Sequence, residues 1–157
     1  MLSSILRGAA AGAAGATALN TATYADMAVR GRPASSIPEQ SIEKLAHTLG
    51  VEVPGDEKQK QARESGLGGL LGLLTGTAVG AAYGAGHGAG WRPGPLTGGF
   101  VATGAALIVA NGPLTVLRVT DPRSWSVADW VSDLVPHLAY GFVTAATFAA
   151  TTRRRRR

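Results

Sequence analysis

Residues 66–88 read GLGGLLGLLTGTAVGAAYGAGHG, and this stretch decides the fold. Six glycines stand four residues apart within it: Gly68, Gly72, Gly76, Gly80, Gly84 and Gly88. In water such a helix would be unstable, because each glycine costs about 1 kcal/mol relative to alanine. In a bilayer the backbone must hydrogen-bond within its own segment, and a row of small residues lets a second helix approach closely. The stretch therefore predicts a transmembrane helix that packs through its glycines.

The row of glycines also has a direction. Each step of four residues turns an α-helix by about 400°, so the row drifts around the helix by about 40° per step. One straight neighbour cannot follow that drift, and we therefore expect two neighbours, one near each end. The row fits helix packing within one chain, and it also fits a homo-oligomer; the sequence leaves both open.

The low proportion of charged residues indicates the class of protein. Charged residues make up 16% of the 157 positions, against about 25% in soluble domains, and 22 residues are glycine. This composition predicts a single membrane domain over residues 1–157, embedded in a lipid bilayer. The absence of cysteine excludes cysteine-based metal sites, and three scattered histidines form no metal-binding motif, so no metal or cofactor is expected.

Four apolar stretches predict four membrane spans, at residues 8–25, 66–88, 96–117 and 129–152. The first is rich in alanine and glycine and is the least hydrophobic, and a signal peptide is the alternative for it. Its small residues Gly8, Gly12 and Ala16 repeat the four-residue spacing, which favours a helix retained in the fold. The expected fold is all-α, an integral membrane four-helix bundle with glycine-zipper packing.

A polar connection, residues 26–65, joins the first two spans. Within it Ile42, Leu45, Ala46 and Leu49 follow at i, i+3, i+4 and i+7, the apolar face of a helix. Gly50 is where that helix is expected to end. The connection therefore contains a short amphipathic helix outside the membrane.

The fourth span opens with ionisable residues. Asp129, Asp133 and His137 stand at i, i+4 and i+8, and Asn111 precedes a Gly-Pro break in the third span. Ionisable groups at membrane depth indicate a ligand or proton site. The alternative is structural, because aspartates are favoured at a helix N-terminus and a buried asparagine bonds neighbouring helices.

Five arginines, Arg153, Arg154, Arg155, Arg156 and Arg157, end the sequence. They account for the net charge of +5, because the other ten Lys and Arg balance ten Asp and Glu. Such a cluster is expected to contact anionic lipid headgroups, and without interleaved aromatic residues it does not predict nucleic-acid binding. Four spans divide the Lys and Arg residues seven to eight between the two sides. The density of the tail favours a cytoplasmic C-terminus in the plasma membrane.

Catalytic motifs are missing from the sequence. It contains no G-x-S-x-G, P-loop or H-E-x-x-H motif, and no set of nucleophile and base stands out. The chain is therefore expected not to be an enzyme. The leading hypothesis is a structural or accessory membrane protein. The alternative is a small transporter or channel with a proton-linked Asp/His cluster.

Several short stretches resemble a known group of proteins: residues 18–20 (ALN), 26–33 (DMAVRGRP), 120–125 (TDPRSW), 129–130 (DW) and 136–141 (PHLAYG). Through them the chain resembles uncharacterised small multi-span membrane proteins of high-G+C bacteria, which are distantly similar to YagU-like inner membrane proteins. The resemblance implies a bacterial multi-span membrane protein without an assigned activity. It carries over no catalytic residue.

Overall fold

The computed structural model describes residues 1–153, and 82% of them are helical, with no strand in that range. The long helices are α1 (Leu2–Arg30), α3 (Glu57–Gly88), α4 (Pro95–Val116) and α5 (Val127–Arg153). Between them lie the short helix α2 (Ile37–Leu49) and the single-turn helix η1 (Pro122–Ser124). The expectation of an all-α fold is confirmed.

Three helices are long and apolar enough to cross a membrane: α3, α4 and the part of α5 from Val127 to Thr152. The helix α1, which contains the predicted span 8–25, is not among them. Its length of 29 residues is sufficient, but its sequence consists largely of alanine, glycine and threonine. The span that the sequence predicts least strongly is thus also the one whose helix is too weakly apolar to qualify as a membrane span.

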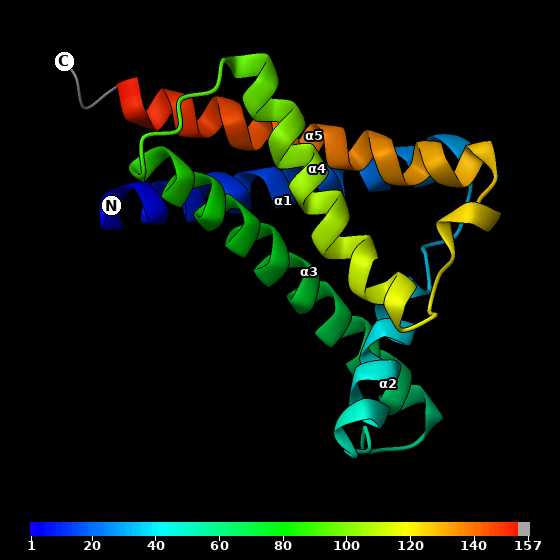
Figure 1. The fold of residues 1–157 in the computed structure, drawn as a ribbon. Coiled ribbons are helices and arrows are strands. Elements are labelled where there is room, and N and C mark those ends of the chain that lie inside the picture. Colours follow the sequence, from blue (N-terminus) through cyan, green and yellow to red (C-terminus); the bar gives the residue numbers. More distant parts are fainter. Residues whose placement is uncertain (154–157) are drawn as a thin grey trace.

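The long helices cross one another in the order α3, α1, α5 and α4 (Figure 1). Helix α1 packs against both α3 and α5, and α4 packs against α5. The N-terminus lies beside the end of α3, where Gly88 approaches Met1, and the second turn of α5 lies beside the end of α1. From their meeting point at the start of α1, helices α1 and α3 diverge toward the start of α3. The short helix α2 covers that diverging end of α3.

Local sequence explains where the helices begin and end. The Asp56 carboxylate accepts a hydrogen bond from the Gln59 backbone N–H, and the Gln59 side-chain oxygen accepts one from the Asp56 backbone N–H. This pair is a capping box that starts α3. Gly31 and Gly50 follow α1 and α2 with φ of 63° and 67°, left-handed values that glycine adopts without strain. The amphipathic helix of the polar connection therefore stops at the expected glycine.

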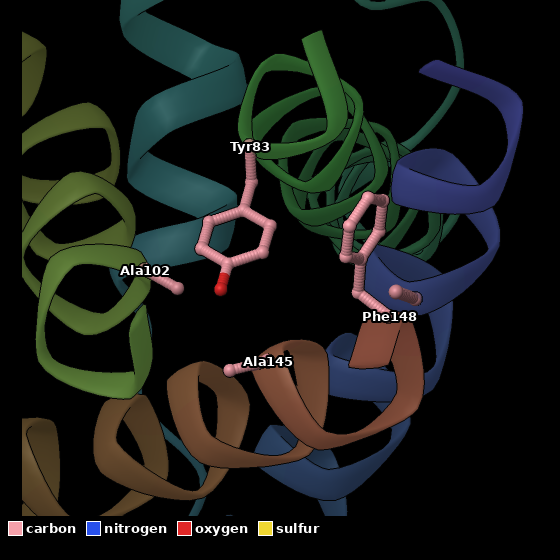
Figure 2. Close-up of a cluster of buried hydrophobic side chains, with 5 residues drawn as sticks. Tyr83, Ala102, Ala145 and Phe148 are labelled. Carbon is pink, nitrogen blue, oxygen red and sulfur yellow. The ribbon is translucent and has the colours of Figure 1, made fainter. Parts of the chain in front are cut away.

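The core is small and lies where the four long helices meet (Figure 2). Its first cluster consists of Ala11 from α1, Tyr83 from α3, Ala102 from α4, and Ala145 and Phe148 from α5, and a second consists of Val79, Ala106 and Tyr140. The rings of Tyr83 and Phe148 meet edge to face, with centroids 5.6 Å apart. Three of the five residues in the first cluster are alanine. Because these side chains are small, the helices must approach closely to leave no space between them.

Large apolar side chains lie mostly on the outside. Ile108 of α4 is 72% exposed, and Leu70, Leu74 and Phe100 are exposed as well. An apolar surface of this extent is unfavourable in water and is the expected surface of a helix in contact with lipid. The distribution of side chains is therefore compatible with membrane insertion of the three apolar helices.

Candidate functional site

The closest helix contact joins α1 to α3 through glycine. Gly8 and Gly12 of α1 lie against Gly80 and Gly84 of α3. A Cβ atom built on Gly12 would lie 2.8 Å from Cα of Gly80, and one built on Gly84 would lie 2.9 Å from Cα of Gly8. Real Cβ atoms do not come this close to backbone atoms, so the two backbones touch and no side chain fits between them.

The remaining glycines of the predicted row differ in their surroundings. Gly76 faces Ala16 and the ring of Tyr140, and Gly88 is in ordinary contact with Met1. Gly68 meets a different neighbour, because a Cβ atom there would lie 2.7 Å from Cβ of Pro38 in α2. Two neighbours, α2 and α1, thus meet the two ends of the row. Gly72 between them has no atom within 4 Å of its would-be Cβ.

Three of the four predicted polar residues come together between α4 and α5. Nδ2 of Asn111 donates a hydrogen bond to Oδ2 of Asp133, at 2.9 Å. Nδ1 of His137 lies 2.7 Å from the carbonyl oxygen of Asp133 and 3.4 Å from its Oδ1. The residue His137 is only 9% exposed. The Asn111 amide bonds a side chain of α5, which agrees with its expected use as a link between helices.

Asp129 lies apart from this cluster. Its carboxylate accepts hydrogen bonds from the backbone N–H and the hydroxyl of Ser126, at 2.9 and 2.7 Å. The Ser126 hydroxyl in turn accepts from the Asp129 backbone N–H, so the pair forms a capping box at the start of α5. For Asp129 the structural interpretation of the sequence accounts for all of these contacts.

Two functional candidates escaped the sequence analysis. Tyr140 and Thr144 are 1% and 0% exposed and continue the inner face of α5 beyond His137. The hydroxyl of Tyr140 donates to the backbone oxygen of Gly76 at 2.6 Å, which links α5 to α3. The spacing from Asp133 through His137 and Tyr140 to Thr144 is four, three and four residues, one helix face. This spacing is the sequence pattern from which Tyr140 and Thr144 could have been predicted.

The far end of α1 is fastened by charges. Oδ2 of Asp26 pairs with Arg30 at 2.7 Å and with Arg32 at 2.6 Å. Arg30 also donates to the Ser132 hydroxyl of α5. These hydrogen bonds, from Arg30 first and then Arg32, hold the pKa of Asp26 below its usual value. The result is a polar clasp (Asp26, Arg30, Arg32 and Ser132) between the end of α1 and the start of α5.

Acidic residues gather at one end of the molecule, together with eight of the Lys and Arg residues. All ten acidic residues lie in the end of α1, in residues 39–64, or in residues 121–133, which all lie on the side of the molecule away from the start of α1 and the end of α3 (Figure 1). We call it the acidic end. The opposite end, where α1 starts and α3 finishes, carries Arg7 and Arg92 and no acidic residue. Of the predicted lipid-contacting residues 153–157, only the backbone of Arg153 falls within the described part of the chain.

A polar cavity of about 830 Å³ lies at the acidic end, between α2, the start of α3 and the turn after α4. Charged side chains of both signs line it, among them Glu43, Glu64, Lys60 and Arg118. Oε1 of the buried Glu64 lies 4.0 Å from Nζ of Lys60. Within residues 1–153, no group of three His, Cys, Asp or Glu side chains is arranged to hold a metal ion.

Comparison of the chain with protein-family models, with curated protein sequences and with solved structures finds no match. The resemblance to small bacterial multi-span proteins therefore stays a prediction.

Proposed function

We propose that this chain is a small integral membrane protein of the bacterial plasma membrane, with a structural or accessory role and no enzymatic activity. In this proposal the four long helices all cross the bilayer and form one four-helix bundle. Helix α1 spans too, because its 29 residues reach roughly 44 Å and it lies between the apolar helices α3 and α5. Its neighbours and its length compensate for its low apolarity.

The observation that carries this proposal is the backbone contact of Gly8 and Gly12 with Gly80 and Gly84. In lipid there is no hydrophobic force between helices, and close approach of small residues supplies the packing energy instead. We therefore interpret the row as a glycine zipper within one chain. Self-association, its other use, would have to occur around Gly72, because α1 already covers Gly80 and Gly84.

We further propose that the end carrying Arg7 and Arg92 is cytoplasmic, which places the C-terminal arginines against anionic headgroups. The support is the density of positive charge, because the five C-terminal arginines form one run from the last residue of α5, whereas the eight Lys and Arg of the acidic end are spread over residues 30–123. Cysteine introduced in place of Lys44 should then react only from the periplasmic side. Labelling of that cysteine from the cytoplasmic side alone would reverse the orientation.

Membrane fractionation tests the proposal as a whole. The expressed chain should sediment with membranes, resist extraction by carbonate and require detergent for purification. A mass measurement in mild detergent then distinguishes a monomer from an oligomer. Recovery of folded chain from the cytosolic fraction would overturn the membrane proposal.

A second candidate function is a small proton-linked transporter or channel. The observation that favours it is the contact of Asn111 and His137 with Asp133, at the start of a polar face that continues to Tyr140 and Thr144. Purified protein in liposomes should then show a pH-dependent proton or solute flux. His137→Ala should abolish the flux, whereas Asp129→Ala, which removes only a helix cap, should retain it. Absence of flux in the parent protein favours the accessory role.

A further inference from the structure

An apolar groove runs between α3 and α4 and has a volume of about 380 Å³. Its lining comes from α3 (Val79, Ala82 and Tyr83), from α4 (Val101, Ala102, Ala105 and Val109) and from Trp91 in the turn between them. Both helices are among the three that are apolar enough to cross a membrane. If the chain is embedded as proposed above, the groove opens toward the acyl chains of the bilayer.

The groove has a floor and a direction. Tyr83 lies between Ala102 of α4 and Phe148 of α5, so its ring closes the groove toward the core (Figure 2). Along α4 the lining residues Val101, Ala105 and Val109 stand four residues apart, which extends the groove over about 12 Å of helix axis. It begins at Trp91, at the end of the molecule opposite the acidic end, and continues toward the middle of the helices. These dimensions suit an elongated, flexible apolar chain.

An amphipathic ring, that of Trp91, lines one end of the groove, and a cation follows it directly in the chain. Trp91 is 38% exposed and packs edge to face on Tyr83, with ring centroids 5.4 Å apart. Arg92 follows it, and its Nη1 donates to the backbone oxygens of His87 and Trp91. Within residues 1–153 the other N–H groups of this guanidinium have no hydrogen-bond acceptor, and no acidic residue shares this end. Tryptophan at this position favours the headgroup region, and arginine recognises phosphate through paired N–H groups.

We propose that this groove binds one anionic phospholipid, with an acyl chain along Val79 and Ala105 and the headgroup phosphate on Arg92. The apolar lining suits the acyl chain of the lipid. The absence of acidic residues around Arg92 suits a negatively charged headgroup. This inference rests on the proposed membrane location, but it is a defined site on the described helices and does not involve the C-terminal arginines.

Fluorescence of Trp91 provides the test. With Trp125→Phe and Trp130→Phe, Trp91 is the only tryptophan left, because the chain contains three. The full-length protein is placed in nanodiscs with equal mole fractions of brominated phosphatidylglycerol or brominated phosphatidylcholine, whose bromines quench tryptophan on contact. We expect stronger quenching by the phosphatidylglycerol, and equal quenching by the two lipids after Arg92→Gln.

Two substitutions on α3 distinguish binding in the groove from general contact of the helix with lipid. Ala82 lines the groove, whereas Ala78 is exposed on the same helix outside it. Ala82→Phe should remove the preference for phosphatidylglycerol, and Ala78→Phe should keep it. Equal quenching in the parent protein overturns the site, as does equal loss in both alanine variants. A chain that does not insert into nanodiscs would instead refute the membrane proposal itself.

Discussion

The two halves of α3 have the same glycine spacing and different surroundings. In the second half, Gly80 and Gly84 touch the backbone of α1, and even a methyl group would not fit. In the first half, Gly72 of the row and the nearby Gly66 and Gly69 have open space beside them, and leucines around them are exposed. Gly68 of this half packs on Pro38 of α2 and does not touch α1. A four-residue repeat therefore indicates a surface suited to close packing. Whether a given glycine is packed depends on where the neighbouring helix diverges.

The largest expected effect comes from placing leucine in each half. Gly80→Leu would force α1 and α3 apart, and because backbone atoms cannot repack we expect a loss of more than about 3 kcal/mol, or no folded protein. Gly72→Leu should leave the thermal unfolding midpoint in detergent near that of the parent protein. Equal effects of the two substitutions would break the distinction between the halves.

Alanine substitutions compare the same two halves of α3 with a smaller expected effect. Gly84→Ala places a methyl group 2.9 Å from Cα of Gly8 and should cost about 1–3 kcal/mol. Gly69→Ala meets nothing and should stabilise the helix by up to about 1 kcal/mol, because glycine is the poorer helix former. Unfolding in graded denaturing detergent measures both. A loss of stability in Gly69→Ala would reveal a partner for the open half, such as a second copy of the chain.

Tyr140 lies near the boundary between the halves, since its hydroxyl bonds the backbone oxygen of Gly76. Tyr140→Phe removes this hydrogen bond while keeping the ring, and we expect a cost of about 1 kcal/mol. Tyr24→Phe is the matched control, because Tyr24 is an exposed residue of α1. Identical unfolding midpoints for the two variants would mean that the boundary contact does not stabilise the fold.

The smallest expected effect is at the polar clasp, which fastens the end of α1 without touching α3. Hydrogen bonds from Arg30 and Arg32 lower the pKa of the folded Asp26 carboxyl, so the folded chain binds fewer protons than the unfolded chain. The clasp is therefore fully stabilising above the unfolded pKa of about 3.9 and is lost as the pH falls through the lowered folded value. Asp26→Asn should flatten this acid dependence slightly, because exposed ion pairs contribute little. An effect larger than that of Gly84→Ala would mean that charge, rather than glycine, holds α1.

The candidate site was predictable in part, and the reason differs between residues. Asp133 and His137 are one turn apart, so helix periodicity alone brings them together. Asn111 is far from them in sequence, and its polar side chain in an apolar stretch indicated an interhelical partner without naming it. Asp129 was grouped with them by the same periodicity, although its contact with Ser126 shows a helix cap. Tyr140 and Thr144 were missed because tyrosine and threonine also occur on exposed helix faces.

By itself the sequence determined the helical class, the approximate ends of α4 and α5, and the capacity of the helices for close approach. These properties depend on local terms: apolar runs, glycine spacing, and capping residues within a few positions of each other. Only the tertiary structure decided that α1 covers Gly80 but leaves Gly72 open, that all acidic residues gather at one end, and that α3 and α4 enclose a groove. These features depend on which helices become neighbours and at what angle they separate, and no local pattern specifies either.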